Sequence, residues 1–188
     1  MINKINLTEK EVFQIVKDAE EKGIKANFDG KTIVDSLDFE AYKFVVPVSF
    51  IETTFEREVS FMGAKFKAYT SFRRTKFRDD VDFNYATFKD DVNFCYATFE
   101  ADAYFSEATF KRYASFTGAT FRGKAYFIKT TFEDNPYFID ATFKADADFS
   151  DATLEDEASF MGTTFKGKIF FNLENKKLKE LFGKRGKK

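Results

Sequence analysis

The chain has 188 residues, 44% of them hydrophobic and 32% charged, and its formal net charge is −1, a balance typical of a globular domain. One cysteine and no histidine exclude a disulfide framework, a multi-thiolate zinc site and the usual catalytic base. We therefore expect no catalytic residues, no metal site and no cofactor, and the 28 phenylalanines without a tryptophan indicate a repeated structural position instead.

Residues 1–36 are predicted to cap the N-terminal end of the repeat. The first residues lack a basic segment followed by an apolar stretch, so we expect a cytoplasmic location and no membrane association. Thr8 and Glu11 form a capping-box pattern, and Gly23 follows an apolar stripe, which predicts a helix over 8–22. Residues 24–34 are expected to form a short hairpin or irregular strand that turns at Asp29-Gly30.

Residues 37–172 contain an 11-residue repeat. From position 39 to position 171, phenylalanine recurs at alternating intervals of five and six residues, and leucine replaces it only at 154. We place Phe13, Phe28, Phe170 and Phe182 outside this register. The residue two places before each of these phenylalanines is usually small or β-branched, and polar residues follow it. This alternation predicts short strands and polar turns, with successive units stacked around one interior.

The predicted core is a ladder of phenylalanines. Its central members are Phe83, Phe88, Phe94, Phe99, Phe105, Phe110, Phe116 and Phe121.

The segments ATFKD (86–90), ATFEA (97–101), ATFKR (108–112) and ATFRG (119–123) resemble the units of pentapeptide-repeat proteins. The resemblance implies an all-β solenoid: a right-handed, quadrilateral, parallel β-helix. Every second unit departs from the pattern by one extra residue. With four sides, one coil takes 22 residues, which gives about six coils over about 29 Å. Residue types at the positions before the phenylalanines favour a vertical repeat of 22, whereas charge alternation favours 11, so both remain open.

Charges follow one another in bands along the repeat. Residues 65–78 are basic, 79–107 mainly acidic, 111–129 mainly basic and 133–157 mainly acidic. If each band wraps one coil, rings of alternating sign form rather than one continuous negative stripe. We therefore predict a rigid protein-interaction or scaffold module with an unidentified protein partner. The alternative that the resemblance implies is a DNA-mimicking inhibitor or protector of DNA gyrase. The basic clusters lack interleaved aromatic residues, so direct nucleic-acid binding is not expected.

Five surface features complete the sequence-based expectations. Tyr104 and Tyr126, one such coil apart, form either an interaction surface or a cross-strand packing pair. Cys95 should face water as an ordinary thiol, and Pro136 should break the strand ladder. Outward threonines at every eleventh position suit strands better than ice binding, and the carboxylate pairs at 79–80 and 90–91 suit turns better than a metal.

Residues 173–188 are predicted to form a short helix, up to Phe182, and a basic tail. This helix would cap the solenoid, or else pair two copies of the chain as a homodimer.

Overall fold

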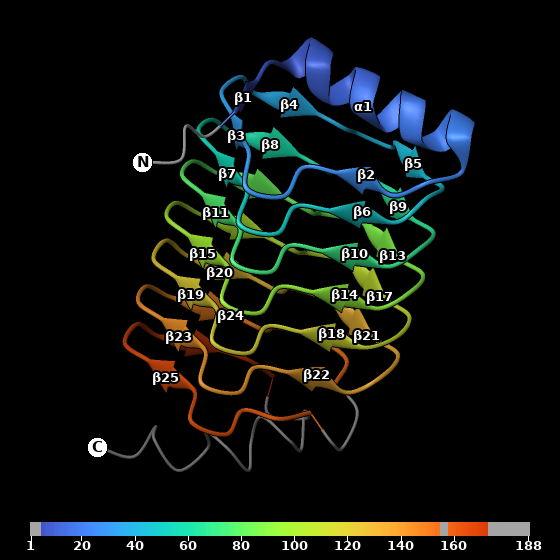
Figure 1. The fold of residues 1–188 in the computed structure, drawn as a ribbon. Coiled ribbons are helices and arrows are strands. Elements are labelled where there is room, and N and C mark those ends of the chain that lie inside the picture. Colours follow the sequence, from blue (N-terminus) through green and yellow to red (C-terminus); the bar gives the residue numbers. More distant parts are fainter. Residues whose placement is uncertain (1–4, 155–157, 173–188) are drawn as a thin grey trace.

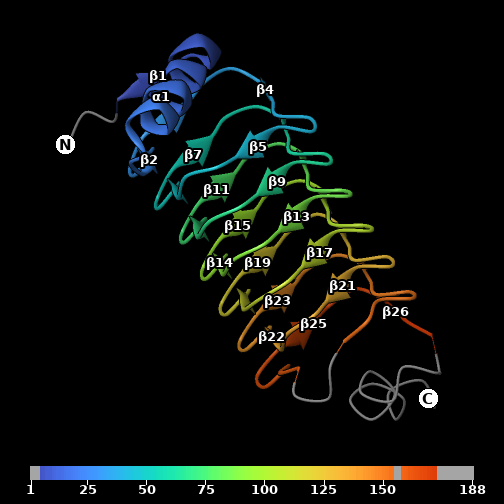
Figure 2. The same cartoon turned by 90° about the vertical axis from the view of Figure 1, so that its right-hand side faces the viewer.

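The protein is a parallel β-solenoid with one helix across its N-terminal end (Figure 1). The computed structural model describes residues 5–154 and 158–172. Within them, two-residue strands stack into four sheets, one on each side of a quadrilateral coil. Turned by a quarter revolution, the molecule shows the same regular stack of coils (Figure 2).

Sheets A and B lie on consecutive sides of the coil. The strands of sheet A, in spatial order, are β1 (Asn6–Leu7), β3 (Thr32–Ile33), β7 (Thr54–Phe55), β11 (Lys76–Phe77), β15 (Thr98–Phe99), β19 (Thr120–Phe121), β23 (Thr142–Phe143) and β25 (Thr164–Phe165). Those of sheet B are β2 (Ala26–Asn27), β6 (Val48–Ser49), β10 (Thr70–Ser71), β14 (Val92–Asn93), β18 (Ala114–Ser115) and β22 (Pro136–Tyr137).

Sheets C and D form the other two sides. The strands of sheet C are β4 (Leu37–Asp38), β8 (Val59–Ser60), β12 (Val81–Asp82), β16 (Ala103–Tyr104), β20 (Ala125–Tyr126), β24 (Ala147–Asp148) and β26 (Ile169–Phe170). Those of sheet D are β5 (Lys43–Phe44), β9 (Lys65–Phe66), β13 (Thr87–Phe88), β17 (Thr109–Phe110) and β21 (Thr131–Phe132). The chain visits the sides in the order B, A, C, D.

The register of the sheets joins position i to position i+22. In sheet D, Thr87 of β13 lies between Lys65 and Thr109 of the neighbouring strands, all in parallel pairing. This settles the choice between 11 and 22 that the sequence left open. Sheet C has seven strands among the described residues, so the solenoid has about seven coils rather than about six.

The additional coil lies upstream of residue 37. β2 and β3 do not form the expected hairpin, because β2 pairs in parallel with β6 in sheet B and β3 with β7 in sheet A. The turn at Asp29-Gly30 does form, with Gly30 at φ +69°. Phe28 therefore belongs to the register after all, and its ring stacks on Phe50 at 4.8 Å.

Phenylalanine rings fill the interior in four stacked columns. The eight central phenylalanines predicted to be core are at most 1% exposed. Rings at equivalent positions of adjacent coils stack with nearly parallel planes, as for Phe99 and Phe121 with centroids 4.6 Å apart and planes 2° apart. Rings from different columns meet edge to face, as for Phe105 and Phe116. Each buried phenylalanine contributes about 1.5–3 kcal/mol of burial free energy, so the filled interior is the main source of stability.

Two kinds of corner connect the strands. A short corner of two residues follows each phenylalanine of sheets B and C, and a long corner of three follows each one of sheets A and D. The second residue of every short corner has positive φ: Gly30, Ala41, Glu52, Gly63, Arg74, Tyr85, Tyr96, Glu107, Gly118, Lys129, Asp140, Asp151 and Gly162. The residue that follows the short corner donates its backbone N–H back across the turn to the carbonyl of the phenylalanine before the corner, as Thr53 does to Phe50 O at 3.0 Å. These are the features of a type II turn.

Helix α1 (Glu9–Lys22) covers the N-terminal end of the core. Its capping box forms as predicted, with Thr8 Oγ1 accepting from the Glu11 amide, and Gly23 ends the helix at φ +62°. Val12, Val16 and Ala19 are buried, and the ring of Phe13 packs against Phe39 at 4.7 Å. The helix thus shields the end coil from water.

Pro136 lies within β22, which still pairs with β18, so the strand ladder does not break before this residue. The strand pairs with β18 on one side, where proline needs no N–H. On the other side Pro136 cannot donate, and the pairing continues as a single bridge between Tyr137 and Ser159. The predicted C-terminal helix lies outside the described residues.

Candidate functional site

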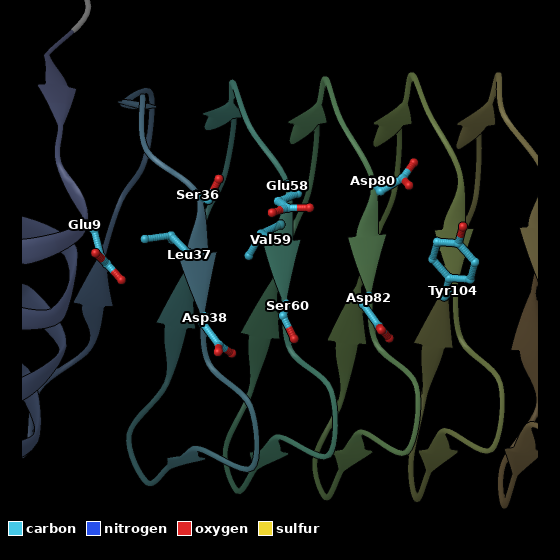
Figure 3. Close-up of a pocket in the computed structure, with 10 residues that line it drawn as sticks. All are labelled: Glu9, Ser36, Leu37, Asp38, Glu58, Val59, Ser60, Asp80, Asp82 and Tyr104. Carbon is cyan, nitrogen blue, oxygen red and sulfur yellow. The ribbon is translucent and has the colours of Figure 1, made fainter.

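A groove on the outer face of sheet C is the candidate site. It has a volume of about 550 Å³ and is lined by Glu9, Ser36, Leu37, Asp38, Glu58, Val59, Ser60, Asp80, Asp82 and Tyr104. Figure 3 shows Glu58 and Asp80 in one row and Asp38, Ser60 and Asp82 in a second row, both running across successive coils. Glu9 of α1 lies at one end and Tyr104 at the other.

Side-chain size explains why the wall is hollowed there. The outward position of sheet C carries Asp38, Ser60 and Asp82 in the first three strands, and then Tyr104 and Tyr126. Three short side chains followed by two large rings leave a depression that ends at Tyr104. Because equivalent side chains of adjacent coils are neighbours, this sequence of sizes becomes a continuous surface feature.

The groove is acidic. Five of its ten lining residues are carboxylates and none is basic. Burial raises the pKa of Asp82, although its carboxylate accepts a hydrogen bond from the Asn84 amide at 2.7 Å. The Asp80 carboxylate accepts from the Asp102 amide at 2.9 Å, which joins two coils on this edge. Within the described part of the chain, none of the five forms an ion pair.

Tyr104 and Tyr126 form a stacked pair next to the carboxylates. Their ring centroids are 5.1 Å apart with planes 5° apart, and both side chains are half-buried. The pKa of Tyr104 is raised, first by burial and then by Asp80, Asp102, Tyr126 and Asp82. The two rings thus pack across strands, and each also keeps exposed surface beside the groove.

The acidic band of residues 79–107 is longer than one coil of 22 residues, so some of its carboxylates also stack along the solenoid axis. Glu58, Asp80 and Asp102 occupy the same position of the long corner in successive coils and form one acidic column, which ends at Lys124. Asp80 and Asp102 of this band therefore align along the axis, and Glu58 of the preceding coil extends the column, because the register joins i to i+22. Sequence reasoning missed this column, although Glu58, Asp80 and Asp102 are spaced by 22.

The remaining predicted surface features are scattered over other sides. Cys95 is half-buried in a short corner, with its Sγ 3.1 Å from Ser115 Oγ. The outward threonines divide between sheets A and D, which lie on opposite sides of the coil. In the described ranges, no group of three or more Asp, Glu or Cys side chains is placed to hold a metal ion. Nor does a helix in those ranges have the length and apolarity to cross a membrane.

A filled interior, a parallel register that repeats once per coil and a patterned outer wall define a solenoid repeat protein. Residues 63–109 and residues 105–153 each match a family model that represents nine copies of the pentapeptide repeat. Residues 63–153 thus belong to the pentapeptide-repeat family. No curated protein matches the sequence.

Proposed function

We propose that this protein is a non-enzymatic, rigid interaction module that binds a basic segment of a protein partner along sheet C. The observation that carries the proposal is the acidic groove, with its five carboxylates and a tyrosine pair at one end. Carboxylates attract lysine and arginine side chains, and tyrosine faces accept guanidinium groups. The carboxylates lie in rows across successive coils (Figure 3), so an elongated segment along the solenoid axis can contact several of them at once.

The interior supports an interaction role over a catalytic one. Stacked phenylalanines occupy the space inside the coils, so a ligand has access only to the outer walls. The sheets hold these walls rigid, and a rigid surface loses little conformational entropy on binding.

Binding of the peptide RSRSRSRS, followed by fluorescence anisotropy at low salt, tests the proposal. The variant Asp38→Asn/Asp80→Asn/Asp82→Asn should bind at least about tenfold more weakly, because three charges are lost while each side chain keeps an acceptor oxygen. The matched control Glu21→Gln/Asp134→Asn/Asp140→Asn removes three acids from other surfaces and should bind normally. Equal affinity of both variants, or equal binding of ESESESES, would contradict the proposal.

The acidic column favours one second candidate, a DNA-mimicking inhibitor or protector of DNA gyrase. Glu58, Asp80 and Asp102 present negative charge along the solenoid axis, as a phosphate backbone does. A supercoiling assay with purified gyrase tests it. Inhibition or protection at micromolar protein that is lost in Glu58→Gln/Asp80→Asn/Asp102→Asn would support this function, and no effect of the wild type would exclude it.

A further inference from the structure

Lysines gather on sheet D, the side that follows the acidic groove. Lys43 of β5 and Lys65 of β9 are directly paired neighbours across the sheet, and both are exposed. Lys67 and Lys89 follow them at the adjoining long corner, also in consecutive coils and exposed. In the part of the chain that the structure describes, none of the four forms an ion pair. We refer to these four residues as the lysine stripe.

This stacking of like charges contrasts with another wall of the same solenoid. At the long corner after sheet A, the first position carries Glu56, Arg78, Glu100 and Arg122 in successive coils. There the signs alternate, and Arg78 Nε lies 3.3 Å from a Glu56 carboxylate oxygen. Like charges directly opposite each other in a sheet destabilise it, whereas opposite charges stabilise it. In both the lysine stripe and the acidic groove, like charges lie next to each other in adjacent coils. Because this arrangement is less stable than alternating charge, it favours an external partner of opposite charge for each surface.

From this arrangement we propose that the partner of the acidic groove is a second copy of this chain, bound through its lysine stripe. The proposal rests on the proposed function, because it assigns the basic partner of the same groove. Both surfaces lie in the first coils of the solenoid: Asp38 and Lys43 belong to one coil, and Asp82 and Lys89 to another. Both also repeat once per coil, so two parallel solenoids bring complementary charges together coil by coil.

The four-sided shape of the coil determines how further copies would add to this contact. Sheets C and D are consecutive sides, so a quarter turn about an axis parallel to the solenoid places sheet C of one copy against sheet D of the next. The contact is heterologous, because different surfaces meet. Repetition of the quarter turn closes a ring of four copies, with the short corners between sheets C and D at its centre.

Light scattering of the full chain at about 20 mM and about 500 mM salt tests the contact. The low-salt mass should rise with concentration toward four times the monomer mass of 21.8 kDa and return to the monomer mass at high salt. A variant without the stripe (Lys43→Gln/Lys65→Gln/Lys67→Gln/Lys89→Gln) and one without the acids (Asp38→Asn/Glu58→Gln/Asp80→Asn/Asp82→Asn) should each stay monomeric. Mixed in equal amounts, they should form a one-to-one pair, because each retains the surface that the other lacks.

Circular dichroism melting establishes that both variants are folded before they are mixed. A wild-type protein that stays monomeric at low salt overturns the inference, as does self-association that persists in both variants or a mixture that does not pair. Binding of RSRSRSRS separates the two proposals: a monomeric protein that binds the peptide in its groove retains the proposed function and loses only this inference.

Discussion

The inside and the outside of the solenoid follow different rules. Inside, the same side chain recurs at almost every position, and rings such as Phe105 and Phe127 stack at 4.8 Å with planes only 1° apart. Outside, the outward column of sheet C changes from aspartate to serine, back to aspartate and then to tyrosine over four successive coils. The inner columns are constrained by packing, which tolerates little change in volume, whereas the outer columns meet water. The inner columns therefore encode the fold, and the outer columns are free to vary from coil to coil.

The largest expected effect comes from emptying an inner position. Phe105→Ala removes a fully buried ring between two stacked neighbours and should lower the free energy of unfolding by about 3–5 kcal/mol, because a cavity remains. Tyr85→Ala is the matched outer change, since this ring is 56% exposed, and should cost less than about 1 kcal/mol. Denaturant unfolding measures both, and equal losses would contradict the separation of inner and outer columns.

A glycine at a long corner tests how closely the coils approach. A Cβ at Gly123 would lie 2.3 Å from the carbonyl carbon of Ala101 in the preceding coil, so Gly123→Ala should destabilise the protein by about 1–3 kcal/mol. Ala145 occupies the same corner position one coil later. Ala145→Gly creates no clash and should cost at most about 1 kcal/mol through chain entropy. Thermal melting of the two variants compares them; a harmless Gly123→Ala would show that the corner relaxes freely.

The short corners test backbone strain without a steric clash. Lys129 has φ +55°, so Lys129→Gly should stabilise the protein by about 0.5–1 kcal/mol. At Gly63, with φ +63°, a Cβ would have only ordinary contacts, so Gly63→Ala should cost about 1 kcal/mol from strain alone. Changes of the same sign in both variants would contradict the turn assignment.

The smallest expected effect is the pH dependence of Asp82. Burial raises its folded pKa, so the unfavourable contribution of the charged carboxylate appears as pH rises through that folded value and is absent in acid. Asp82→Asn keeps the acceptor for the Asn84 amide, as Asn93 does for the Cys95 amide in sheet B. The variant should thus be slightly more stable than wild type at pH 7 and equal to it at about pH 3. Urea titrations at both pH values measure the difference, and a gain that persists in acid would exclude this cause.

The inner columns were predictable because one environment selects one kind of side chain. The spacing of phenylalanine identified the strands, and the capping box of Thr8 identified α1. Phe28 was misplaced, because Ile33 stands where the first coil would otherwise carry the next phenylalanine, and the series therefore begins only at residue 39.

The corners and the groove were harder to predict. Positive φ at the short corners was missed because alanine, glutamate, arginine, tyrosine, lysine and aspartate fill most of them, although Gly30, Gly63, Gly118 and Gly162 share the position. The groove was missed because it requires the choice of 22 over 11. Only that choice places Asp38, Ser60 and Asp82 beside one another, and it stayed open because the residue types favoured 22 whereas the alternation of charge favoured 11.

The parallel register also defines how the molecule could be lengthened or shortened. Excision of one whole coil from the middle leaves every surviving side chain on its original wall. Excision of half a coil preserves the inner alternation equally well, but it turns everything downstream by half a revolution, so that later segments of sheet C continue sheet B. Changes in length by half-coils would therefore exchange opposite walls of the rod while the inner packing stays the same.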